Sequence, residues 1–228
     1  MTDELLNSPF RETYLTEENQ IRVVHPPNQG WIEKKLNKEE LAVLWEYIED
    51  REEDSCKNNL AGNIHESNHL EDRFDWFFNN TLYPLIQKYA EQFGDLGTRR
   101  SVGTADHPYK LSMMWVNYQK QGEFNPLHDH TGVYSFVVWM KIPTDWKEQN
   151  KIPIASNSNC PKVSTFCFTY TDILGLVRSA TFPLSTESEG TLVFFPASLS
   201  HQVYPFFNCD EDRISISGNI ALDTRVVI

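Results

Sequence analysis

The stretch Asn125-Pro-Leu-His-Asp-His130, followed by the apolar run Tyr134-Ser-Phe-Val-Val-Trp-Met140, is the most informative part of this sequence. Alternate side chains of an extended segment point to the same side, about 6.5–7 Å apart along the backbone. His128 and His130 can therefore bind one metal ion, while Asp129 between them faces away. The apolar run behind them predicts a strand.

Short apolar or alternating runs, separated by polar turns, continue from about residue 110 to the end of the chain. This spacing, with no helical pattern in between, favours a β-barrel or jelly roll over alternating strand and helix units. The predicted strands span residues 111–118, 134–142, 163–170, 191–195, 202–206 and 214–220. Residues 144–160, which are polar and rich in Asn and Lys, are expected to form a long loop or insertion.

Helices are predicted ahead of this β-rich part. Asn37 is a typical helix N-cap, with Glu40 three positions later. The apolar residues that follow, at 41, 44, 45 and 48, lie on one face of a helix. A strand or two is expected among the first thirty residues, around 21–25, and residues 51–70 are polar and loop-like.

A second helix is predicted from about residue 71 to residue 93. Pro84 should kink it or divide it into two, because proline lacks the N–H that a helix interior needs. The side chains expected to point inward are Phe74, Phe77, Phe78, Leu82, Leu85, Ile86 and Tyr89. We therefore expect one domain over residues 1–228, mainly β with N-terminal helices, in which about 1–108 support a core formed by about 109–228.

Composition narrows the classes of partner. The formal net charge of −12 argues against a nucleic-acid partner, because phosphate-backbone binding depends on clustered Lys and Arg. No apolar stretch reaches the roughly 18–20 residues that span a bilayer, and the polar first residues lack the apolar core of a signal peptide. The four cysteines show no CxxC spacing. A cytoplasmic protein with unpaired cysteines and no membrane partner is therefore expected.

A third histidine completes a candidate metal site. His201 follows the apolar run 191–196 and is the partner that we expect for His128 and His130. Fe(II) with open coordination positions is typically held by two histidines and a carboxylate. Asp129 can therefore replace one imidazole if the local backbone departs from the extended form, and otherwise it faces solvent or accepts a hydrogen bond from a ligand. The remaining histidines are expected to be ordinary residues: His25, His65, His69 and His107.

Arg213, at the start of the strand-like stretch 213–219, is a candidate anion-binding residue. Its planar guanidinium can donate two parallel hydrogen bonds to a carboxylate. Ser215 alternates with it on the same strand, and Tyr118, Asn117 and Asn219 are further candidates to line the same pocket. The alternative for the guanidinium is an ion pair with one of the acidic residues before it, Asp210, Glu211 or Asp212.

As a set, these residues resemble a known family. The resemblance rests on residues 115–122, 125–130, 194–196, His201 and 213–217, and extends weakly to residues 60–63. It is to the 2-oxoglutarate/Fe(II)-dependent oxygenases, closest to a prolyl-hydroxylase-like branch with a His-x-His motif found in bacteria and phages. The resemblance implies a double-stranded β-helix, iron bound by His128, His130 and His201, and the C5 carboxylate of 2-oxoglutarate bound by Arg213 with Ser215. It departs from the wider superfamily at His130, where Asp or Glu normally stands.

The implied activity is hydroxylation of an unactivated C–H bond by O₂ and 2-oxoglutarate, with ascorbate as a candidate accessory reductant and peptidyl proline as a candidate prime substrate. Three neutral imidazoles leave the full dipositive charge on iron, so a dianionic 2-oxo acid is expected to make the site neutral. Two alternatives stay open. One is a three-histidine cupin-type dioxygenase without 2-oxoglutarate, and the other is a non-catalytic jelly-roll binding module with a structural ion.

Overall fold

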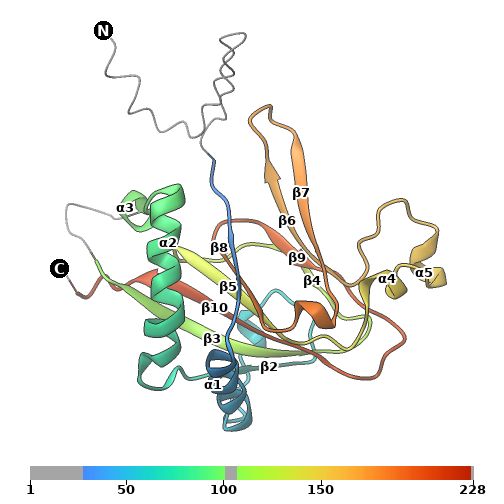
Figure 1. Cartoon of the computed structure of the whole chain (residues 1–228), viewed down its shortest axis with the longest axis horizontal. Coiled ribbons are helices and arrows are strands. Elements are labelled where there is room, and N and C mark those ends of the chain that lie inside the picture. Colours follow the sequence, from blue (N-terminus) through green and yellow to red (C-terminus); the bar gives the residue numbers. More distant parts are fainter. Residues whose placement is uncertain (1–27, 101–106, 227–228) are drawn as a thin grey trace.

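The structure is a computed structural model that describes residues 28–100 and 107–226 (Figure 1). The strand expected around residues 21–25 lies outside the described residues. Within them, two antiparallel sheets form the core, in the orders β1-β8-β5-β10-β3-β2 and β4-β9-β6-β7. The strands are β1 Ile32–Lys35, β2 Glu66–His69, β3 Tyr109–Gln119, β4 Asn125–His128, β5 Tyr134–Lys141, β6 Thr165–Thr171, β7 Val177–Pro183, β8 Thr191–Pro196, β9 His201–Val203 and β10 Arg213–Leu222. This is the predicted jelly-roll core, a double-stranded β-helix.

The interior strands were the predictable ones. Each of the six expected strands is present, as β3, β5, β6, β8, β9 and β10. The strands that sequence analysis missed are β1, β2, β4 and β7, and these are the outermost strands of the two sheets. An edge strand pairs on one side only and is often short or polar, as β2 (ESNH) is, so its apolar pattern is weak.

The six-stranded sheet is covered on both faces. On one face, helices α1 (Lys38–Glu49) and α2 (Tyr83–Phe93) share an apolar core with residues such as Val116 and Ile216 (Figure 1). On the other face, the four-stranded sheet packs against residues such as Val137 and Trp139. Because β5 lies between these two cores, residues 134–140 are all buried, which accounts for their unbroken apolar sequence.

Helix α1 begins as predicted. The Asn37 side chain accepts a hydrogen bond from the Glu40 N–H, and the Glu40 carboxylate accepts one from the Asn37 N–H, both at 2.9 Å. Together they form a capping box, which satisfies two of the free N–H groups at the helix start. Leu44 and Ile48 on the predicted apolar face are buried.

The second predicted helix is divided, and its start was placed too early. Phe74 and Asp75 have φ values of 58° and 54°, so no helix can pass through them. The Asp72 carboxylate instead accepts hydrogen bonds from the N–H groups of Phe77 and Phe78 at 2.8 and 2.7 Å. Phe74 is consequently 99% exposed rather than inward, whereas the other six side chains predicted to be inward are buried.

The predicted break at Pro84 takes the form of a change in helix type. A π-helical turn, Phe78–Leu82, leads directly into α2, with Pro84 in the first turn of α2. Because the helix is continuous here, the missing N–H of Pro84 interrupts the hydrogen-bond ladder, and the wider π-helical turn lies at this interruption. A short helix, α3 (Leu96–Arg100), follows α2.

An insertion lies between β5 and β6. Residues 144–160 form a loop with two single-turn helices, α4 (Trp146–Gln149) and α5 (Pro153–Ser156).

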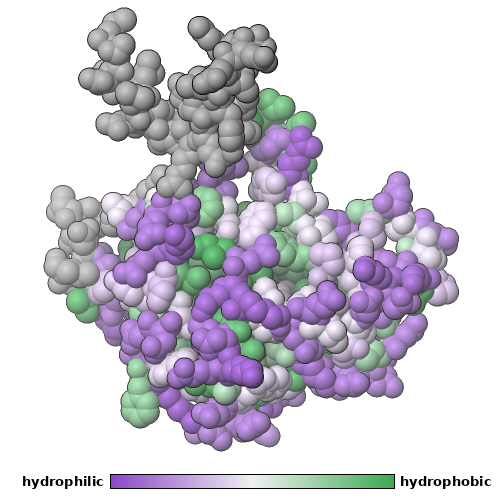
Figure 2. All heavy atoms as spheres, viewed as in Figure 1, coloured by the Kyte–Doolittle hydropathy of each residue, from purple (hydrophilic) through white to green (hydrophobic). Residues whose placement is uncertain are grey.

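The β6–β7 hairpin projects from the body, and apolar side chains gather at its tip (Figure 2). Those side chains are at least 51% exposed and are Ile173, Leu174, Leu176 and Val177. In the described part of the chain, no helix has the length and apolar character that crossing a membrane requires.

Candidate iron and 2-oxoglutarate site

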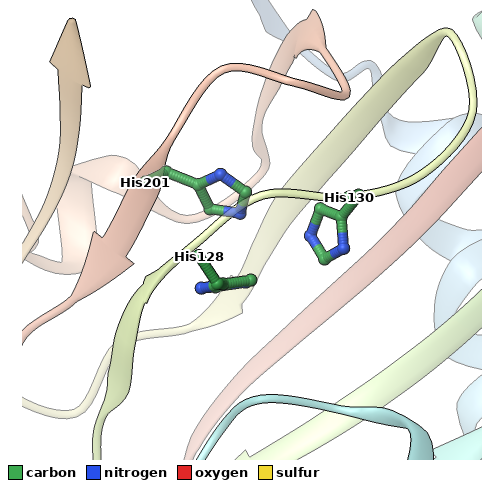
Figure 3. Close-up of side chains that lie close together, drawn as sticks. All are labelled: His128, His130 and His201. Carbon is green, nitrogen blue, oxygen red and sulfur yellow. The ribbon is translucent and has the colours of Figure 1, made fainter.

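Three histidine side chains meet between the two sheets, as Figure 3 shows. His128 ends β4 and is the direct ladder partner of His201, which begins β9. His130 follows two residues after His128, and its N–H donates to the carbonyl of Ala197 at 2.9 Å. The possible ligand atoms of the three rings all lie within 4.8 Å of one another. Nitrogens that share one ion at about 2.0–2.1 Å lie within about 4 Å of each other, so small ring rotations would suffice.

Backbone carbonyls fix the protonation of two of these rings. Nδ1 of His128 lies 2.7 Å from the carbonyl oxygen of Pro126, and Nδ1 of His201 lies 2.8 Å from that of Leu199. A carbonyl can only accept, so the proton of each neutral ring is assigned to Nδ1. The Nε2 atoms are then left with free lone pairs, which is the arrangement of a histidine ready to bind a metal.

Burial keeps the rings of His130 and His201 neutral. Desolvation is the main cause that lowers the pKa of His130 to about 4 and that of His201 to about 3, with a smaller contribution from the nearby His128. A charged imidazolium is costly away from water, so the neutral form is favoured at pH 7. The neutral form is also the one that a metal ion requires.

Asp129 is not part of the cluster. Its side chain is exposed, and the candidate metal group found in the described part of the chain consists of histidines alone. The structure therefore groups the three imidazoles that sequence analysis selected and leaves the carboxylate facing solvent.

Arg213 is buried without a carboxylate partner. It is 1% exposed, and its Nε and Nη2 donate to Oε1 of Gln119 at 3.1 and 2.8 Å. Nη2 also donates to the carbonyl of Tyr204 at 2.8 Å, and the guanidinium lies over the Phe206 ring. Nη1 has no hydrogen-bond partner among the described residues. Burial among these neutral groups lowers the pKa of Arg213 to about 9.

The alternative of an ion pair at Arg213 is wrong. Glu211 pairs with Lys141 at 2.8 Å, and Asp210 accepts a hydrogen bond from Gln121. Oδ1 of Asp212 is buried without a partner. The guanidinium is therefore available for an external anion.

A pocket connects the histidines with the surroundings of Arg213. Gln119, the ladder partner of Arg213, and Ser215, two positions along β10, both line it. Asn117 lines it as well and accepts a hydrogen bond from Ser67 at 2.8 Å. The aromatic part of its wall is formed by Trp115, Phe136, Trp139, Phe166 and Phe195.

Two predicted pocket residues lie elsewhere. Tyr118 alternates with Asn117 and Gln119 on β3, so its ring faces the helix side of the sheet, where it lies under the guanidinium of Arg51. Asn219 is buried, but its Oδ1 accepts a hydrogen bond from Ser135 at 2.8 Å, and it is not among the pocket residues. Gln119 was missed by sequence analysis, although its two-residue spacing from Asn117 places both on the same face.

Comparisons with known proteins agree with this geometry. Residues 113–219 match the family described as "Putative 2OG-Fe(II) oxygenase". A 2OG-Fe(II) oxygenase family oxidoreductase from Burkholderia pseudomallei has a similar structure, with a TM-score of 0.53, 11% identity, and coverage of 84% of this chain and 85% of that one. A non-heme alpha ketoglutarate dependent carbocyclase from nogalamycin biosynthesis has a TM-score of 0.50 and 9% identity, and the match covers 86% of this chain and 80% of that one. A Pseudomonas putida prolyl-4-hydroxylase has a TM-score of 0.49 and 14% identity, with coverage of 85% of this chain and 92% of that one.

No curated protein matches the sequence. The two structural similarities with TM-scores of 0.53 and 0.50, both at low identity, show the fold, and the family match adds the class of enzyme. The family match identifies the part of the chain that carries the site, residues 113–219, as similar to the 2-oxoglutarate/Fe(II)-dependent oxygenases. This match indicates an oxygenase whose cofactor is Fe(II) and whose co-substrate is 2-oxoglutarate.

Proposed function

We propose that His128, His130 and His201 hold the Fe(II), and that Arg213 binds the far carboxylate of 2-oxoglutarate, with Gln119 and Ser215 beside it. The enzyme would then hydroxylate an unactivated C–H bond of a prime substrate. The observation that carries the co-substrate assignment is the free Nη1 of a buried arginine.

The energetic argument for Arg213 is direct. A buried donor that lacks an acceptor costs roughly 1–3 kcal/mol, and more when it is charged. Gln119 and Tyr204 occupy Nε and Nη2 and so fix the plane of the guanidinium, which leaves Nη1 as the nitrogen of Arg213 that has no partner among the described residues. A carboxylate at Nη1 would satisfy this donor and neutralise the buried charge.

The histidine cluster fits ferrous iron. Two of its rings present free Nε2 atoms, and three protein ligands leave positions open for a chelating co-substrate and O₂. When bound, Fe(II) and 2-oxoglutarate supply the oxidising chemistry, with succinate and CO₂ as products. The chain's own residues orient the reactants and exclude water, through the aromatic wall of the pocket.

We propose a small molecule or a peptide as the prime substrate, with peptidyl proline as one candidate. We also propose that residues 1–228 act as one domain, because β1 and β2 complete the same sheet as β3 and β10. All four cysteines are free, which fits a location in the reducing cytoplasm.

The test is turnover of the co-substrate. Purified protein is incubated with Fe(II), 2-oxoglutarate and ascorbate in air, and succinate is measured with and without a broad panel of candidate substrates. We expect slow succinate formation that needs both Fe(II) and 2-oxoglutarate and that stops when iron is chelated. A complete lack of succinate with every member of the panel would contradict the proposal.

A further inference from the structure

The pocket carries a surplus of positive charge. The charged side chain of its lining is that of Lys57, and the lining contains no Asp or Glu. In a site with two histidines and a carboxylate, the charges of Fe(II), that carboxylate, one arginine and dianionic 2-oxoglutarate cancel. Here the third ligand is the neutral His130, so the same set keeps one positive charge. The expectation that 2-oxoglutarate alone would make the site neutral had left out Arg213.

Lys57 adds a second positive charge. It begins the 3-10 turn Lys57–Asn59, and the structure shows no ion pair or hydrogen bond of its ammonium group with any described residue. Many other lysines have an acidic partner. These are Lys34, Lys88, Lys110, Lys141 and Lys151. What sets Lys57 apart is its place at the pocket, where no acidic side chain of the lining offsets its charge.

The segment that carries Lys57 is fixed next to the iron site. Immediately before it, the Cys56 N–H donates to the carbonyl of Ser67 in β2 at 3.0 Å. After it, Asn63 and Phe124 exchange backbone hydrogen bonds beside β4, the strand that ends in His128. The position of Lys57 relative to the histidines is thus determined by backbone pairing on both sides.

Gly62 allows the segment after Lys57 to lie close to β4. A Cβ atom at this residue would overlap with Oδ1 of Asn125, which belongs to β4. The absence of a side chain lets residues 60–64 pack directly on β4, and four of these five residues line the same pocket as Lys57 and the histidines.

We propose that Lys57 binds an anionic group of the prime substrate, so that the enzyme acts on acids in preference to their neutral counterparts. This inference rests on the proposed function. Lys57 is exposed and lines the pocket, so it can attract an anion without a desolvation cost of its own. An acidic substrate would also reduce the positive charge that 2-oxoglutarate leaves at the iron and the buried Arg213. A positive pocket in an otherwise acidic protein would also concentrate small anions at the site.

The test uses matched pairs of small molecules, each a carboxylic acid with its primary amide. Binding to protein loaded with Zn(II) and 2-oxoglutarate is followed by saturation-transfer NMR, which requires no turnover. We expect acids to bind more tightly than their amides, and Lys57→Gln to weaken acid binding about tenfold, the size of one charge-assisted hydrogen bond. Lys57→Arg should keep most of the binding.

Controls separate this inference from the proposed function. Lys38→Gln removes another exposed lysine, on α1, and should leave acid binding unchanged. The affinities for Zn(II) and 2-oxoglutarate should be the same in the Lys57 variants as in the wild type. Equal binding of acids and amides, equal acid binding by wild type and Lys57→Gln, or no binding by any panel member would overturn the role of Lys57 alone. Failure of the wild type to bind metal or 2-oxoglutarate would overturn the proposed function itself.

Discussion

The two faces of the six-stranded sheet are built from the same strands but carry different chemistry. On β10, Ile214 and Ile216 pack toward the helices, whereas Arg213 and Ser215 belong to the side of the pocket. On β3, Val116 alternates with polar pocket residues in the same way. The period of two in a strand thus separates stability from function at neighbouring positions. Substitutions on the pocket face should mainly reduce activity or ligand binding, whereas substitutions on the helix face should mainly lower the free energy of unfolding.

The largest effect is expected at the metal site. His201→Ala removes a buried imidazole that we assign to iron, so succinate formation should fall at least about a thousandfold, as expected when a metal ligand is lost. The free energy of unfolding of the metal-free protein should fall by no more than roughly 1–3 kcal/mol, because the change opens space into the pocket, where water can hydrate the carbonyl of Leu199 that loses its donor. Metal content by atomic absorption and unfolding in urea are the measurements. Full iron binding by this variant would remove His201 from the site.

The opposite signature is expected on the helix face. Ile216→Ala deletes a side chain that is fully buried in the apolar core, and it should lower the free energy of unfolding by about 2–5 kcal/mol. Below its melting temperature, the variant should bind iron and 2-oxoglutarate as the wild type does. Urea unfolding and anaerobic titration give the two quantities. A large loss of co-substrate affinity in the folded variant would show that the two faces are coupled.

Arg213→Gln tests the difference between the two faces at adjacent positions, because Arg213 lies on the pocket face and its neighbour Ile214 packs toward the helices. Loss of one charge-assisted hydrogen bond costs roughly 1.5–3 kcal/mol, so the KM for 2-oxoglutarate should rise about ten- to a hundredfold. The metal affinity should stay the same. Arg178→Gln, on the exposed β6–β7 hairpin, is the matched control. An unchanged KM would mean that the co-substrate binds elsewhere.

The smallest effect is expected at Tyr118. Its hydroxyl faces away from the pocket, so Tyr118→Phe should change the KM for 2-oxoglutarate less than twofold. The same steady-state assay measures this, with Arg213→Gln as the reference for a residue on the pocket face. A rise of tenfold or more would restore the role that sequence analysis gave to this hydroxyl.

Sequence analysis predicted correctly those features that depend on the local pattern of apolar and polar residues. The three histidines and the interior strands were predicted because each lies in or beside an apolar run with a clear period. The edge strands were missed because each pairs with a neighbour on one side only, and a strand of this kind is often short or polar, so its apolar pattern in the sequence is weak. Tyr118 was misplaced because its hydroxyl was weighed without the alternation along β3.

Other features depend on contacts that no local pattern reveals. The helix start was missed because Asp72 caps N–H groups five and six residues ahead, across two residues in the left-handed region. The role of Gln119 depends on its pairing with Arg213, which is 94 residues away in the sequence. The prediction of one domain over residues 1–228 stays a prediction.

The central claim is that three imidazoles share one iron ion that 2-oxoglutarate chelates while Arg213 holds its far carboxylate. Anaerobic addition of Fe(II) and then 2-oxoglutarate, followed by visible spectroscopy, tests it most directly. We expect a weak charge-transfer band at one iron per chain in the wild type, no band in His201→Ala, and a band that needs far more 2-oxoglutarate in Arg213→Gln. A colourless wild-type complex with iron bound, or an undiminished band in His201→Ala, would contradict the claim.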